Sequence, residues 1–268
     1  MTPEQIAELV PRLVTTGVLA LVGLSALGFP GSFAAVRPYF SRLNLSGEDR
    51  ERMNAALGAR KAAENIPAWL ARAFGVVTLV LAASALVPQI PSIFPYSAWC
   101  AAFAAATVIA SAHFREAARR RVAVLAPRNP RTALPVPLIL AILACVAMEI
   151  ALALVTPYRA AWAVVALSSV ALLVIAGQLA GAPALILGND VPVERFIDER
   201  LRIARTTNVA GLAIAPPIVL LGATHEFSSV GAAAWVVAVA AAAVAGVYLV
   251  RAQSVDSQSV LTAMSGRV

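Results

Sequence analysis

The chain has 268 residues, of which 60% are hydrophobic and only 13% are charged, and its formal net charge is +7. A soluble domain carries roughly 25% charged residues, so this composition excludes an ordinary water-soluble protein and indicates an integral membrane protein. A helix needs about 20 apolar residues to cross a bilayer, so the length of the chain corresponds to a number of membrane-spanning helices. The sequence predicts an all-α, polytopic bundle of transmembrane helices.

The chain contains seven apolar runs, at about residues 13–36, 66–87, 96–114, 134–156, 160–180, 208–223 and 228–250. Each approaches the ~20 residues of a helical span. The N-terminus carries Glu4 and Glu8 instead of the basic n-region of a secretory signal, so we expect the first run to stay in the mature protein. The pattern therefore predicts about seven transmembrane helices.

The basic residues indicate the orientation of these helices. Most of them fall in alternate connectors, at residues 37–65, 115–133 and 189–207, whereas the other three connectors hold only Arg159. Arginine and lysine are enriched in cytoplasmic loops of membrane proteins. We therefore expect a multi-pass protein of a bacterial-type inner membrane, with its N-terminus outside and its C-terminus in the cytoplasm.

Two parts of the chain resemble each other. ERMNAALGARKAAEN at residues 51–65 and ERFIDERLRIARTTN at 194–208 share their first two residues, their length and their last residue. Farther on, Ala-Trp opens two apolar runs that both end in arginine, at Trp99 and at Trp235. Such matches are typical of a parallel repeat in a membrane protein, although alanine-rich spans also match by composition alone. We expect a first repeat at 1–133, a linking helix at 134–156, and a second repeat with a cytoplasmic tail at 157–268.

The two matching segments predict charged helices that extend into the cytoplasm. Ser46 followed by Asp49 is typical of a capping box, so we expect a helix to begin there. One interpretation is that these segments are solvated helix ends with anchoring arginines. The other is that they carry a site, for which the candidates are Arg52, Arg60, Glu64, Asn65, Arg200, Arg205 and Asn208.

The same segments resemble the MAPEG proteins, four-helix membrane enzymes of eicosanoid and glutathione metabolism. The matching residues are Arg52, Ala56, Leu57, Glu64, Asn65 and Pro67 in the first unit, and Arg200, Leu201, Ala204, Gly211, Leu212 and Pro217 in the second. The family's Asn and Glu, three residues apart, would fall near Lys61 and Glu64 and near Thr207 and Ala210. The resemblance implies that the first unit retains Glu64 and Arg60 and that the second has lost glutathione binding.

Polar residues within the apolar runs are the other candidates. Glu149 lies in the fourth run, roughly 10 Å from its outer end at 1.5 Å per residue. An ionisable residue inside a membrane is costly and indicates function, so we expect Glu149 to face the bundle and to serve proton or cation coupling, or else to be a neutral structural residue. Pro216 and Pro217 interrupt the sixth run, which predicts either a cavity beside a broken helix or a kink without a ligand.

Several chemistries are excluded by what the sequence lacks. His113 and His225 would lie on opposite sides of the membrane, so we expect no haem and no zinc site. The seventh run has no lysine for a retinal Schiff base, and no nucleotide-binding fingerprint occurs. We expect no cofactor and no nucleic-acid partner. The expected partners are lipids, including anionic lipids near the arginine cluster at 115–121, and further copies of the chain or subunits of a larger complex.

Three functions are consistent with these features. We favour a non-enzymatic transporter or channel for a small or lipophilic solute, because of the repeat, Glu149 and the proline pair. A non-catalytic subunit of a membrane complex is the first alternative, since alanine-rich helices pack closely. A MAPEG-like glutathione-dependent transferase is the second.

Overall fold

The computed structural model describes residues 3–27, 45–64, 68–87, 89–90, 94–119, 133–182, 191–224 and 229–253. Within these ranges the protein is helical and has no strand, as the sequence predicts. The helices are α1 (Pro3–Leu27), α3 (Gly47–Glu64), α4 (Ala68–Ser84), α5 (Phe94–Arg119), α6 (Val136–Val155), α7 (Arg159–Ala180), α8 (Val191–Leu212), α9 (Ala215–Thr224) and α10 (Ser229–Gln253).

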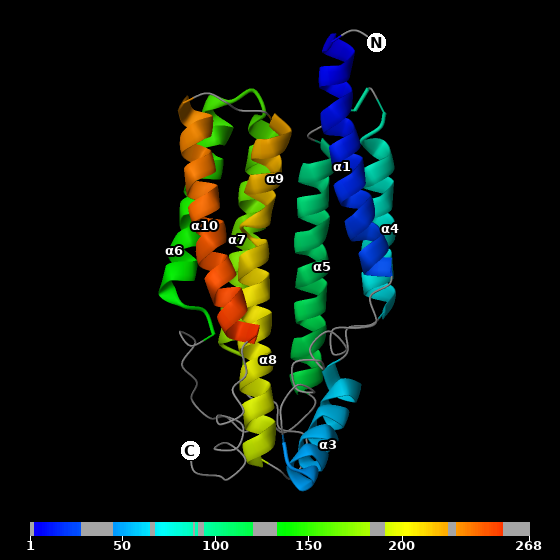
Figure 1. Cartoon of the computed structure of the whole chain (residues 1–268), viewed down its shortest axis with the longest axis vertical. Helices are drawn as coiled ribbons and strands as arrows, with labels where there is room; N and C mark the ends of the chain where they lie inside the picture. Colours follow the sequence, from blue (N-terminus) through cyan, green and yellow to red (C-terminus); the bar gives the residue numbers. More distant parts are fainter. Residues whose placement is uncertain are drawn as a thin grey trace.

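The long helices lie side by side along one axis (Figure 1). In that view α1, α5, α7 and α10 run downward along the chain, and α4, α6 and α8 run upward. The helix α3 lies at the lower end, beside the beginning of α8. In the described part of the chain, α6, α7 and residues 230–252 of α10 are long and apolar enough to cross a membrane. Residues 15–24 of α1 and 69–84 of α4 form shorter apolar helices. The count of seven spans and the internal repeat stay predictions.

The core of the bundle lies between α6, α7, α8, α9 and α10. Leu138 and Ile142 of α6 and Leu172 of α7 are fully buried there, together with alanines of the neighbouring helices, including Ala210 and Ala241. Because lipid tails are as apolar as leucine, close contact between helices, rather than exclusion of water, holds such a bundle together. Small residues at the contacts allow this close approach.

A second core joins the two charged segments. Met53 and Leu57 of α3 cluster with Ile197 and Leu201 of α8, and all four are nearly or fully buried. The helix α3 begins where the sequence predicts, because the Ser46 hydroxyl accepts a hydrogen bond from the Asp49 backbone N–H (3.3 Å). The two segments are therefore more than solvated helix ends, since their apolar faces pack against each other.

The helices α1 and α4 approach closely at two glycines. A Cβ atom on Gly75 would lie 2.9 Å from the carbonyl oxygen of Gly23, and one on Gly23 would lie 3.1 Å from the carbonyl oxygen of Gly75. Real Cβ atoms essentially never come within 3.0 Å of such an atom. Glycine at both positions is therefore what permits this crossing.

Arg12 of α1 binds the segment that follows α4. Its Nη1 donates hydrogen bonds to the carbonyl oxygens of Val87 (2.9 Å), Ile90 (3.0 Å) and Ala85 (3.3 Å). These carbonyls lie just beyond the C-terminal end of α4, where the partial negative charge of the helix dipole favours a cation. Arg12 is itself buried, although it lies at the start of an apolar run of the sequence.

The helix α5 connects the α1–α4 pair to the rest of the bundle, because it packs against both α4 and α7. On the α4 side, Trp99 stacks on Phe103 with ring centroids 5.6 Å apart, and Phe74 meets Phe103 edge-on at 5.7 Å. Aromatic pairs of this geometry contribute about 0.5–1.5 kcal/mol beyond their buried area. This cluster fixes α5 against α4.

Candidate functional site

The sixth apolar run is divided between two helices. The α8 helix ends at Leu212, residues 213 and 214 form a tight turn, and α9 begins at Ala215. Pro216 and Pro217 are thus the second and third residues of α9, where a helix tolerates proline because the first N–H groups need no partner. The break therefore lies just before the prolines and not at them.

This arrangement leaves one buried carbonyl without its helical donor. In a continuous helix the N–H of residue 217 would donate to the carbonyl of residue 213, but Pro217 has no N–H. The Ser169 hydroxyl of α7 supplies the missing bond, with its Oγ 3.1 Å from the Ala213 carbonyl oxygen. A side chain of the neighbouring helix thus satisfies the freed carbonyl.

Glu149 of α6 lies at the same place. Its Oε1 is 3.0 Å from the Ser169 Oγ, and both side chains are fully buried. Glu149 therefore faces the interior of the bundle next to the helix break. Three segments that are distant in the sequence meet here: the middle of α7, the second half of α6 and the turn between α8 and α9.

Because Ser169 has a single hydroxyl hydrogen, its two contacts depend on whether Glu149 is protonated. A serine hydroxyl has one hydrogen, so it donates to only one acceptor at a time. If Glu149 is ionised, the Ser169 hydrogen serves either Glu149 or Ala213, and the other oxygen loses its donor. If Glu149 is protonated, it donates to Ser169 Oγ, which in turn donates to Ala213. The arrangement therefore satisfies every one of these contacts only with a proton on Glu149.

The second carboxyl oxygen of Glu149 has no hydrogen-bond partner among the described residues. The ion pairs found in the described part of the chain do not include Glu149. Cys145 lies one helical turn before Glu149 on α6 and is buried, but a thiol is only a weak donor. An ionised Glu149 would thus be a buried and uncompensated negative charge.

The cytoplasmic candidates are placed differently. Arg52 of α3 is paired with Asp49 at 3.7 Å, and Arg200 of α8 lies over the Phe196 ring, 5.5 Å from its centroid. Both contacts lie within a single helix, as expected of charged residues that stabilise the end of a helix. Arg205 is half-buried and Asn208 is exposed on α8. The side chains of Arg60 and Glu64, and all of Asn65, lie outside the described residues.

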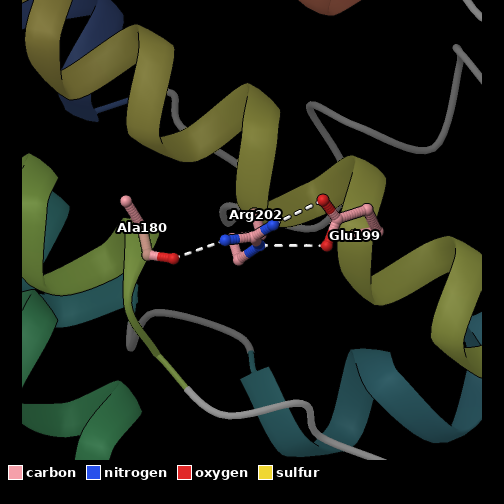
Figure 2. Close-up of polar contacts among 3 residues, drawn as sticks. All are labelled: Ala180, Glu199 and Arg202. Atoms are coloured by element: carbon pink, nitrogen blue, oxygen red, sulfur yellow. Dashed lines mark hydrogen bonds and ion pairs between the residues drawn. The ribbon is translucent and has the colours of Figure 1, made fainter. Parts of the chain in front are cut away.

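A different arginine of α8 joins two helices at this end. Arg202 is buried, pairs with Glu199 one turn earlier, and donates through Nη1 to the carbonyl of Ala180, the last residue of α7 (Figure 2). Its Nε donates to Glu199 Oε2 at 3.1 Å. Arg202 therefore fastens α8 to the C-terminal end of α7, where a cation opposes the helix dipole.

Sequence reasoning missed Ser169 and Arg202. The Ser168-Ser169 pair in an apolar run was the available signal, but it does not show which hydroxyl leaves its own helix. In the structure Ser168 donates to the carbonyl of Val164 on its own helix (2.8 Å), whereas Ser169 contacts Glu149 of α6 and the carbonyl of Ala213 in the α8–α9 turn.

Comparison with known proteins finds no matching family model, no matching curated protein and no matching solved structure. The resemblance to MAPEG proteins therefore rests on the two charged segments alone and stays a hypothesis. In the described residues, no group of three or more His, Cys, Asp or Glu side chains is placed to hold a metal ion. The chemistry of this chain has to be inferred from its own contacts, among which the Glu149–Ser169–Ala213 chain is the most unusual.

Proposed function

We propose that this chain is a proton-coupled transporter of a small or lipophilic solute, and that Glu149 is its proton-binding group. The observation that carries the proposal is the buried Glu149 carboxyl, linked through Ser169 to the carbonyl that a broken helix leaves free. An ionisable residue inside a membrane protein is costly, so its presence there favours a functional role. This one lies at the point where the helix is interrupted.

The proposed setting is a bacterial-type inner membrane, crossed about seven times, with the N-terminus outside and the C-terminus in the cytoplasm. The alternating directions of the helices support this topology (Figure 1). So does the position of the charged helix α3 beside the charged first half of α8, at one end of the apolar bundle. Anionic lipids at this end are the proposed lipid partners.

Protonation of Glu149 would change how the break is held. With the proton bound to Glu149, Ser169 can donate to the Ala213 carbonyl, and this hydrogen bond holds α7 against the α8–α9 turn. When the proton leaves, the carboxylate competes for the same hydrogen and the turn loses its donor. A carrier needs such a dependence of packing on ion binding, because a bound ion shifts a conformational equilibrium only through different contacts in the two states.

The test uses the full chain in liposomes that contain a pH-sensitive dye. A panel of small amphipathic cations and weak acids is added outside, and solute-dependent movement of protons is recorded. The parent protein is expected to couple at least one solute to proton movement. Glu149→Gln keeps the shape and hydrogen-bonding capacity but cannot titrate, so it should abolish proton movement while the protein still folds.

The matched control is Ser168→Ala, which removes a neighbouring hydroxyl that bonds only within its own helix. It should transport like the parent. A Glu149→Gln variant that transports the solute with unchanged pH dependence would show that the proton-binding assignment is wrong.

The alternative of a non-catalytic subunit also has an observation in its favour. The apolar window of α10 is only 22% buried, so this helix presents a broad face to lipid or to another protein. Purification from the native membrane in mild detergent distinguishes the transporter hypothesis from the subunit hypothesis. Stoichiometric partner chains, together with no solute-dependent proton movement by the isolated protein, would favour the subunit.

A further inference from the structure

We infer that the oxygens around Glu149 also form a site for a small monovalent cation, with Na⁺ as the expected ion, which competes with the proton for this carboxylate. The inference deepens the proposed function and rests on it for its physiological meaning, since it names a second coupling ion. The binding itself is testable without transport. It is carried by the geometry of the oxygens and by their charge.

The geometry brings hard oxygen ligands together from three helical segments. Ser169 Oγ lies 3.0 Å from Glu149 Oε1 and 3.1 Å from the Ala213 carbonyl oxygen, and the fully buried Glu149 Oε2 has no partner among the described residues. Backbone carbonyls freed at broken helices coordinate Na⁺ in membrane transporters, and here a carboxylate and a hydroxyl offer further oxygen ligands beside such a carbonyl. The close spacing of these oxygens suits a small ion better than K⁺.

Charge balance selects a monovalent ion. The site holds a single carboxylate, and the ion pairs found among the described residues do not involve it. One Na⁺ would neutralise it, whereas a divalent ion would leave a net positive charge in a medium of low dielectric constant. The Ala213 carbonyl lies between the C-terminal end of α8 and the N-terminal end of α9, where the two helix dipoles oppose each other, so the Glu149 carboxylate itself supplies the negative charge that favours a cation.

The neighbouring groups do not supply a competing charge. Cys145 lies one helical turn before Glu149 on α6, and Cys100 of α5 is buried in the cluster that includes Met148 of α6. Both thiols are ordinarily neutral near pH 7. The last charged residue of α8 is Arg205, which lies about two helical turns before the break. The pH dependence of cation binding should therefore reflect competition at Glu149.

Thermal unfolding of the purified full chain in detergent tests the inference. Melting is compared in NaCl and in KCl at equal ionic strength over a range of pH, and binding of radioactive sodium gives the stoichiometry. At alkaline pH Na⁺ should raise the melting temperature and K⁺ should not. At tenfold excess over its Kd, Na⁺ should multiply the ratio of folded to unfolded protein about 11-fold. Lowering the pH should abolish the difference, because the proton displaces the ion.

Three variants locate the site. Glu149→Gln removes the charge, so its melting should be equal in the two salts. Ser169→Ala removes one ligand and should weaken sodium binding about tenfold, the effect of roughly 1.4 kcal/mol. Ser168→Ala removes the neighbouring hydroxyl, which bonds Val164 of its own helix, and should bind sodium like the parent.

Equal melting in NaCl and KCl at every pH, with no bound sodium, would overturn the cation site and leave proton coupling untouched. An equal loss of sodium affinity in Ser168→Ala and Ser169→Ala would also overturn it, because the ion would then not be held at Ser169. If Glu149→Gln fails to fold, the sodium affinities of the two serine variants still show whether the ion is bound at Ser169. Sodium binding to a protein in which Glu149→Gln leaves transport unchanged would keep the site and remove the proposed function.

Discussion

Adding one methyl group to a glycine is expected to have opposite effects at two positions in the α1–α4 pair. At Gly75 the new Cβ would lie 2.9 Å from the backbone oxygen of Gly23 and 3.0 Å from Leu27 Cγ. A backbone oxygen cannot rotate away, so the helices must separate, and overpacking of this kind costs about 1–3 kcal/mol. At Gly17 a Cβ meets nothing within 4 Å.

The net changes follow from these contacts and from helix propensity. Alanine is favoured over glycine within a helix by about 0.5–1 kcal/mol, which applies at both positions. Gly17→Ala should therefore raise the free energy of unfolding by about that amount. Gly75→Ala should lower it by up to about 2.5 kcal/mol, which is the steric cost less the gain in helix propensity. The difference between the two variants isolates the steric contribution.

The assay is reversible unfolding in mixed micelles, followed by circular dichroism as the fraction of denaturing detergent rises. Gly23→Ala provides a second test at the same crossing, since its Cβ would lie 2.9 Å from Leu79 Cγ and 3.1 Å from the Gly75 oxygen. It should destabilise like Gly75→Ala. If Gly75→Ala proved as stable as Gly17→Ala, the close crossing of α1 and α4 would be refuted.

Other parts of the fold make further predictions. Arg12→Ala should lower the free energy of unfolding by at least about 3 kcal/mol in the same assay, because all three hydrogen bonds of Nη1 are lost and charge-assisted bonds are worth about 1.5–3 kcal/mol each. Arg72→Ala, at an exposed position, should change it by less than about 0.5 kcal/mol. Ile197→Ala should speed hydrogen exchange in α3, because a fully buried contact worth about 2–5 kcal/mol is removed from the α3–α8 core, and unchanged exchange would contradict that packing. A single cysteine at Ser92 should react with an impermeant thiol reagent in intact cells and one at Asn129 should not, whereas the opposite labelling would reverse the proposed topology. Calorimetry with millimolar glutathione should show binding if the MAPEG resemblance reflects function, and no heat of binding would remove that hypothesis.

The place of Glu149 was partly predictable from the sequence. A carboxyl group in an apolar run must face protein and not lipid, so its burial follows from the cost of exposing it to hydrocarbon. The proline pair likewise predicts a carbonyl without a helical donor, because proline has no N–H. Neither pattern identifies Ser169 as the group between them. That contact depends on how α6, α7 and the α8–α9 turn are rotated and shifted against one another.

The sequence by itself determined the class of the protein, the start of α3 and the interruption of the sixth run. These follow from composition, from a capping residue and from the missing N–H groups of Pro216 and Pro217, all of which act within one segment. Only the tertiary structure decided which partners those segments meet. The pairing of α3 with α8 and the meeting of Glu149, Ser169 and Ala213 arise from contacts between residues far apart in the chain, for which local patterns carry no information.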